Sequence, residues 1–245
     1  MTDLTGLVAL VTGSSSGIGE ASARHLAEAG ANLVINSSSS VDAGEKVSKS
    51  LPNKSFYHQA DISSKDESVA MIETVIERFG RLDILVNNAG WTTSIPHDDL
   101  ASLTDEIFRK TFDVNVFGTW LLTKAAMPHL LRSPRGCVIN ITSVAGVRPI
   151  GSSIAYSMSK AALNQMTVLL AKSMGPVRVN AVAPGLVATP WTEDWDDLHR
   201  AVAERAPLKR SATPDDIAQA VMALATNTYV TGEVMVVDGG LTQIM

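Results

Sequence analysis

Short apolar runs alternate along the chain with segments in which apolar residues recur every three or four positions. LVALV (7–11) precedes a helical pattern over 17–29, and NLVIN (32–36) precedes another over 41–49. The clearest helical period lies in KDESVAMIETVIERFG (65–80), where the apolar side chains would share one face of a helix. The first third of the chain therefore predicts strands and helices in alternation.

The same alternation continues to the end of the chain. Long helices are predicted over 104–131 and 155–173, and the further strands are SFYHQ (55–59), LDILVNNAG (82–90), GCVINITS (136–143), VRVNAVAPG (177–185) and EVMVVDGG (233–240). Strands that are apolar throughout are covered on both faces, and helices between them make the sheet parallel. We therefore predict an α/β fold: one doubly wound domain over residues 1–245, with about seven parallel strands and right-handed crossovers. The weakly patterned segment at about 188–212 is predicted to be a substrate-loop insertion.

Composition narrows the possible classes of protein. The 245 residues carry a net charge of −5 without a Lys/Arg run, which disfavours nucleic-acid and anionic-membrane binding. No apolar run is long enough to cross a bilayer, and the N-terminus does not resemble a signal peptide, so we expect a soluble, cytoplasmic protein. Cys137 is the single cysteine and the five histidines form no ligand-spaced cluster, so we predict no disulfide and no catalytic metal.

A glycine-rich loop joins the first strand to the first helix. It reads VTGSSSGIGEA and places Gly13, Gly17 and Gly19 directly between the two elements. Glycines there permit a tight turn, let the backbone approach a pyrophosphate and let helix and strand pack closely. The free N–H groups and partial positive charge of the helix N-terminus favour phosphate. An ordinary strand-to-helix turn is the alternative, but three glycines in this position favour a dinucleotide site.

The spacing of these glycines is Gly-x-x-x-Gly-x-Gly, and with it the chain resembles the short-chain dehydrogenase/reductase family. The resemblance covers nearly the whole chain and rests on the order of six motifs: TGSSSGIG (12–19), NNAG (87–90), Asn115 in DVNVFG, Ser143 in ITS, YSMSK (156–160) and PG (184–185). It implies a Rossmann-type domain and an NAD(P)(H)-dependent oxidoreductase. Such an enzyme interconverts a carbonyl and a secondary alcohol by hydride transfer.

Tyr156 and Lys160 are the predicted acid/base pair. Their spacing puts both side chains on one helix face, one turn apart. A tyrosine with a pKa near 10 is a poor base at neutral pH, and a neighbouring ammonium would lower that pKa toward the operating range. The resemblance implies that Lys160 also binds the nicotinamide ribose. Taken alone, either residue could equally be a core tyrosine or a solvated lysine.

Two further polar residues complete the predicted catalytic set. Ser143 follows the fifth strand at the carboxyl edge of the sheet, where ligands bind in such folds, and its hydroxyl can hold the substrate oxygen. Asn115 lies inside a predicted helix, where asparagine has no intrinsic advantage. The resemblance gives Asn115 a water that relays protons to Lys160. The alternatives are a turn cap for Ser143 and a bond to its own backbone for Asn115.

The second strand indicates which cofactor is bound. NAD enzymes place an acidic residue at the end of this strand to bind the ribose diol. Here the strand ends in Asn36 and Ser37 to Ser40, and hydroxyls at a helix start could instead host a 2′-phosphate. NADP(H) is therefore favoured, while the absence of an arginine leaves NAD(H) open. The predicted cofactor-contacting residues are Gly13, Ser15, Ser16, Gly17, Ile18, Gly19, Asn36, Ser37, Ser38, Asp61, Ile62, Asn88, Ala89, Gly90, Tyr156, Lys160, Pro184, Gly185, Val187 and Thr189.

The sequence determines the substrate and the oligomeric state less closely than the catalytic residues, and it leaves a rival function open. The predicted pocket is bounded by 91–94, 143–151 and 191–208, and the sequence does not decide between a small ketone or alcohol and a 3-oxoacyl thioester. Apolar residues in excess on helices 104–131 and 155–173 predict a homo-oligomer, a tetramer or else a dimer. The rival reading is a cofactor-binding sensor or scaffold without turnover. The presence of both Tyr156 and Lys160 favours an enzyme.

Overall fold

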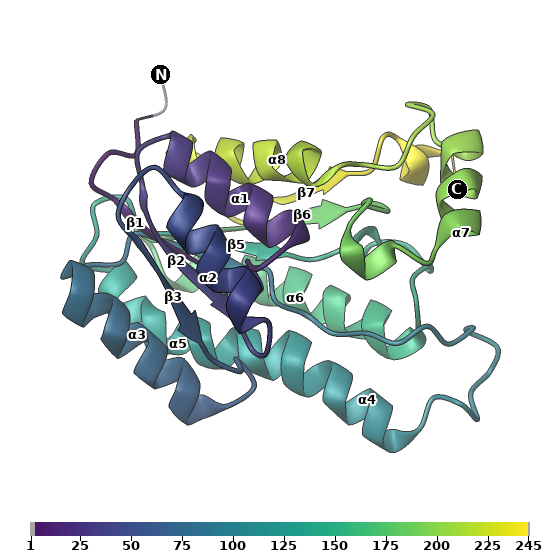
Figure 1. Cartoon of the computed structure of the whole chain (residues 1–245). Coiled ribbons are helices and arrows are strands. Elements are labelled where there is room, and N and C mark those ends of the chain that lie inside the picture. The colour runs from purple at the N-terminus through teal and green to yellow at the C-terminus, as the bar shows by residue number, and fades with distance from the viewer. Residues whose placement is uncertain (1–2, 245) are drawn as a thin grey trace.

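Seven parallel strands form the centre of the protein in a computed structural model that describes residues 3–244 (Figure 1). Their order across the sheet is β3-β2-β1-β4-β5-β6-β7. The strands are β1 (Val8–Val11), β2 (Asn32–Ser37), β3 (Ser55–Gln59), β4 (Ile84–Asn87), β5 (Cys137–Ile141), β6 (Arg178–Pro184) and β7 (Val234–Val237). The predicted doubly wound α/β fold is confirmed.

The central strand β1 shows why the sheet is parallel and covered on both sides. Leu10 pairs with Val34 of β2 on one side and with Leu85 of β4 on the other, and all four residues of β1 are buried. Because the chain winds outward from β1 in both directions, the strand order reverses between β1 and β4. In open α/β sheets such a reversal leaves a crevice at the carboxyl ends of the strands, where ligands bind.

Helices cover the two faces of the sheet (Figure 1). On one face lie α1 (Gly17–Glu28), α2 (Val41–Ser50) and α8 (Pro214–Thr226), and on the other α3 (Lys65–Phe79), α4 (Asp105–Phe112), α5 (Thr119–Leu130) and α6 (Ile154–Ser173). Each layer buries its own apolar cluster against the sheet, with Leu26 and Val221 in the first and Met71 and Leu122 in the second. The two clusters hold the site-bearing strand ends in place.

The helix predicted over 104–131 is interrupted in the structure. A π-helical segment, Asp113–Gly118, separates α4 from α5 and contains Asn115. Widened turns of this kind are rare and often occur at functional sites. The apolar period of the sequence does not reveal the interruption, and within it Asn115 bonds to Trp91, which lies in a distant segment.

Two helices beyond the predicted set also appear. α8 is capped by Thr213, whose side chain forms a capping box with that of Asp216, a start signal that was available in the sequence. α7 (Asp196–Arg205) lies inside the segment 188–212, which also contains a short 3₁₀ turn at Pro190–Thr192. Among residues 3–244, no helix has the length and apolar character of a membrane span, and no three His, Cys, Asp or Glu residues gather as a metal site would need.

Candidate active site

A cavity of about 1330 Å³ opens at the carboxyl ends of the strands, at the point where the strand order reverses. Its wall includes the glycine loop, the ends of β2, β4, β5 and β6, and α7. All of the predicted cofactor-contacting residues line it except Gly19, and so do Ser143, Tyr156 and Lys160. The tertiary structure therefore brings together residues that lie more than 170 positions apart in the sequence.

The three loop glycines serve different purposes. Gly13 (φ +59°) and Gly17 (φ +57°) adopt left-handed backbone conformations that favour glycine. Gly19 is a packing residue, because a Cβ there would lie 2.4 Å from the carbonyl oxygen of Gly13. The loop leads into α1, whose N-cap Ser16 makes no side-chain capping bond. The first turn of α1 thus has N–H groups that Ser16 does not cap, and Gly17 and Ile18 line the cavity, as a phosphate site at a helix N-terminus requires.

The NNAG segment clamps the glycine loop. The side-chain amide of Asn88 donates to the carbonyls of Thr12 and Gly13 at 2.9 Å each. In return the Thr12 hydroxyl accepts from the backbone N–H groups of Asn88 and Ala89 at 3.0 Å. Thr12 was not singled out from the sequence, although it lies inside the TGSSSGIG motif. Asn88 therefore shapes the loop that would hold the pyrophosphate.

A capping serine sets the position of Tyr156 and Lys160. The Ser153 hydroxyl accepts from the backbone N–H of Tyr156 at 3.2 Å and so fixes the start of α6. One turn further on, the Nζ of Lys160 lies 5.6 Å from the centroid of the Tyr156 ring. The predicted pair is confirmed as neighbours on one helix face.

Lys160 is buried, and no carboxylate side chain among residues 3–244 forms an ion pair with it. Its side chain is 3% exposed, and its Nζ donates to the carbonyl oxygen of Ile141 at 2.9 Å. Burial lowers the pKa of this ammonium to about 8. Lys160 is therefore charged below about pH 8 and loses its charge as the pH rises through that value.

The Tyr156 hydroxyl has the opposite shift to the one expected from the sequence. Burial raises the pKa of Tyr156 to about 12, and the nearby Ser143 hydroxyl only partly offsets this. Ser143 itself caps the following 3₁₀ turn by accepting from the N–H of Ala145 at 3.1 Å. Tyr156 is thus a neutral phenol at physiological pH, a form suited to giving a proton rather than taking one.

Asn115 is buried behind the cavity and does not line it. Its amide oxygen accepts from the backbone N–H of Trp91 at 2.7 Å, and its amide nitrogen donates to the Trp91 carbonyl and to the Ser159 hydroxyl at 3.0 Å each. A Cβ on Gly90 would lie 3.3 Å from the Asn115 amide oxygen and 3.6 Å from the Nζ of Lys160. Asn115 therefore fixes the segment beside Lys160, while the water relay stays a prediction.

Two residues at the end of β2 that are predicted to contact the cofactor are buried. Asn36 is buried, with its amide donating to the carbonyls of His58 and Ala60 and accepting from the N–H of Gly13. The Ser37 hydroxyl lies 2.9 Å from the Tyr57 hydroxyl and is also buried. Both residues form the wall of the cavity, but their polar atoms already have partners. Ser38, by contrast, is exposed and lines the cavity.

The remaining wall combines aromatic and apolar side chains with charged ones, among them Asp194, Asp196, Asp197, Arg200 and Arg205. Trp91, Ile150, Trp191, Trp195 and Leu198 all line it, and Trp191 is 48% exposed. The Nζ of Lys110 lies 4.4 Å above the Trp91 ring. Lys110 and Ser159 were missed by the sequence analysis, because their relevance depends on contacts across the fold. This side of the cavity can hold a bulky apolar ligand.

Comparison with known proteins gives consistent matches along the whole chain. A family model described as enoyl-(acyl carrier protein) reductase matches residues 13–242. A Streptomyces violaceoruber protein named as ketoacyl reductase 2 of the granaticin polyketide synthase is 51% identical over 237 residues, 95% of each chain. The 3-oxoacyl-(acyl-carrier-protein) reductase of Thermotoga maritima is 35% identical over 245 residues, 97% of this chain and 98% of the relative.

A solved structure shares the fold. The crystal structure titled as a short-chain dehydrogenase/reductase of Burkholderia xenovorans superimposes with a TM-score of 0.90 at 34% sequence identity. The match covers 98% of this chain and 99% of that structure.

Proposed function

This chain belongs to the short-chain dehydrogenase/reductase family, and from that premise we propose that it is an NADP(H)-preferring ketone reductase with Tyr156 as its acid. Membership makes it an NAD(P)-dependent oxidoreductase that interconverts carbonyls and alcohols. The observation that carries the proposal is the placement of Tyr156, Lys160 and Ser143 together at the wall of one cavity.

The proposed mechanism assigns one task to each polar residue. A nicotinamide cofactor held by the glycine loop and by Lys160 would supply the hydride. Ser143 holds the substrate oxygen by a hydrogen bond, next to the Tyr156 hydroxyl. Tyr156 donates its proton to the alkoxide as that charge develops, and the Lys160 ammonium stabilises the phenolate that remains. Asn115 positions the Trp91 backbone beside them.

The pKa directions in the structure favour the reduction direction. A phenol with a pKa near 12 is protonated at neutral pH, so the acid needed for reduction is present in nearly every molecule. Alcohol oxidation would instead require the phenolate, which becomes abundant only at higher pH. This supports the assignment of Tyr156 as the acid of the reduction step.

The proposed substrate is a bulky apolar or aromatic ketone, free or as a 3-oxoacyl thioester. The three tryptophans along the cavity support this, since aromatic walls bind large apolar groups. The names of the relatives from Streptomyces violaceoruber and Thermotoga maritima include ketoacyl and 3-oxoacyl reductase.

A turnover screen of monocyclic ketones, fused-ring ketones and 3-oxoacyl thioesters with both cofactors would test the proposed substrate class. Cofactor binding without turnover on any carbonyl would favour the sensor alternative.

The cofactor preference can be tested at Ser38. A 2′-phosphate carries nearly two negative charges, so a carboxylate beside it is unfavourable. We expect wild type to favour NADPH over NADH in kcat/KM, and Ser38→Asp to shift that ratio toward NADH by about tenfold, about 1.4 kcal/mol. Ser38 is a better test position than Ser37, because the Ser37 hydroxyl is buried against Tyr57.

A matched control separates local repulsion from a general charge effect. Ser50→Asp adds the same charge at the other end of α2, away from the cavity, and should leave the cofactor ratio unchanged. An unchanged ratio in Ser38→Asp, or a wild-type preference for NADH, would show that this loop does not read the 2′-phosphate.

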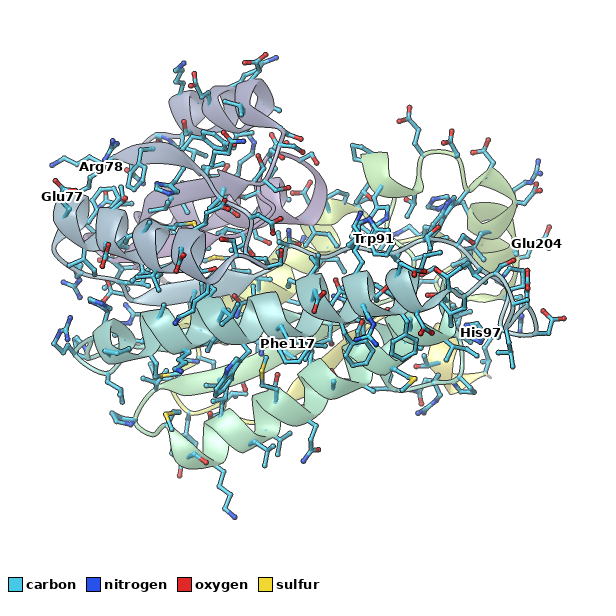
Figure 2. The ribbon with its side chains drawn as sticks, turned by 90° about the horizontal axis from the view of Figure 1, so that it is seen from below. Glu77, Arg78, Trp91, His97, Phe117 and Glu204 are labelled. Carbon is cyan, nitrogen blue, oxygen red and sulfur yellow. The ribbon has the colours of Figure 1, made fainter. Side chains whose placement is uncertain are left out.

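We also propose a homotetramer built on the outer surface of the helices α4 to α6. Five large apolar side chains are exposed there: Phe117, Trp120, Met158, Val168 and Leu169. Figure 2 shows Phe117 on the helical layer that faces the viewer. Large apolar side chains exposed on neighbouring helices are typical of protein interfaces.

Light scattering at micromolar concentration tests the proposed assembly. We expect a tetrameric mass for wild type and a smaller one for Phe117→Glu or Leu169→Glu, because a charge buried in an apolar interface is unfavourable. Leu100→Glu is the control, since Leu100 is 68% exposed in the loop before α4 and should not change the mass. A monomeric wild type would contradict the proposal.

A further inference from the structure

His199 lies on α7, which borders the substrate side of the cavity, and no role described so far uses it. Figure 1 shows α7 at the edge of the molecule, apart from the two helix layers. The apolar contacts that hold it, among the described residues, form a small cluster of Val202, Ala206 and Leu241 with Leu186 packed against it. Few buried apolar contacts therefore hold α7 in place, so hydrogen bonds contribute a larger share of what fixes its position.

The His199 ring bonds to both ends of the segment that contains α7. Its Nδ1 lies 2.8 Å from the Ser211 hydroxyl, and its Nε2 lies 3.2 Å from the Thr192 carbonyl oxygen and 3.3 Å from the Thr192 hydroxyl. A carbonyl oxygen only accepts, so Nε2 carries a hydrogen and donates it to Thr192. In the neutral ring, Nδ1 then accepts from the Ser211 hydroxyl.

Thr192 continues the connection toward the cofactor side of the cavity. Its hydroxyl donates to the carbonyl of Val187 at 2.6 Å and accepts from the N–H of Thr189 at 3.3 Å. The Thr189 side chain lies over the glycine loop, since a Cβ on Gly17 would lie 3.3 Å from its Cγ2. A continuous series of contacts thus runs from α7 through His199 and Thr192 to the glycine loop.

We propose that His199 is a positioning residue that couples α7 to the cofactor-contacting segment 187–192, so that cofactor binding orders the α7 wall of the substrate site. The proposal rests on the cofactor-binding function proposed above. A ligand that restrains Thr189 also restrains Thr192, and the ring transmits this restraint to α7. Without the ring, cofactor would still bind, but α7 would no longer respond.

Limited trypsin digestion measures this coupling directly. Arg200, Arg205, Lys209 and Arg210 are exposed cleavage sites within 188–212. In wild type we expect saturating NADPH to slow cleavage there by about tenfold, within the usual range of coupling between sites. In His199→Ala we expect most of that protection to disappear, with the ketone KM raised by about the same factor and kcat changed less.

Two further variants distinguish coupling from a loss of packing. His199→Gln keeps a nitrogen donor for the Thr192 carbonyl and should restore part of the protection. Glu204→Ala is the control, because this residue lies on the same helix and Figure 2 shows it at the outer edge of the molecule. It should behave as wild type.

The outcomes separate this inference from the proposed function. Equal NADPH protection in wild type and His199→Ala would overturn the positioning role, and so would a wild type that binds NADPH without any protection of α7. Failure of wild type to bind either NADPH or NADH would instead overturn the proposed function itself.

Discussion

Replacing Tyr156 with phenylalanine is expected to remove nearly all carbonyl reduction and to leave cofactor affinity close to wild type. General acid/base groups contribute about 10²–10⁴-fold, or about 3–5 kcal/mol of barrier. The ring of phenylalanine fills the same space on α6, and Ser153 still caps the helix through the backbone of residue 156. The measurements are kcat with a reactive ketone and the Kd of NADPH by fluorescence titration.

The control for this variant is the same chemical change at an exposed site. Tyr229 is 99% exposed, so Tyr229→Phe should retain full activity. If Tyr156→Phe kept more than about a tenth of wild-type kcat, the acid would have to be another group, since a lost acid typically costs at least 10²-fold.

The second large effect is expected at Lys160. In wild type, reduction should decline as the pH rises through about 8, because the buried ammonium loses the charge that stabilises the Tyr156 phenolate. Lys160→Met should lower kcat/KM by at least about 10²-fold, show no such decline, and bind cofactor more weakly. The measurements are a pH–rate profile from pH 6 to 10 and the NADPH Kd.

Loss of folding does not account for this expected result. Burial lowers the pKa of Lys160 from 10.5 to about 8. Between these two pH values the unfolded chain therefore binds more protons than the folded one. The contribution of this group to the free energy of unfolding rises with pH across that range. At pH 7 the buried ammonium is destabilising, and Lys160→Met should be at least as stable as wild type in thermal melting. Lys172→Met, an exposed change on the same helix, is the control for both measurements. An unaltered pH–rate profile in Lys160→Met would refute the electrostatic role of Lys160. An unchanged Kd for NADPH would refute its predicted bond to the nicotinamide ribose.

Most of the fold follows from local patterns that the sequence carries by itself. Apolar strands such as VALV of β1 and CVINI of β5 are buried along their whole length, so neither could belong to a one-faced sheet. The helical period of 65–80 is confirmed by α3, with Met71, Ile72 and Val75 buried. The glycine loop could be read as a phosphate site because its position between a strand and a helix is a local property.

The tertiary structure alone decided the features that depend on contacts between distant segments. The π-helical segment contains Asn115, which bonds to Trp91, and the Ser37 hydroxyl lies beside that of Tyr57. His199 bonds to Thr192 and Ser211, which lie on either side of α7 in the sequence. The pKa shifts of Tyr156 and Lys160 come from burial, and the burial of a side chain cannot be deduced from its position in the sequence. Sequence period and spacing report which face of an element is apolar and which residues share a helix turn. Desolvation and hydrogen-bond partners are set by whatever the whole fold places next to a side chain, and so they appear only in three dimensions.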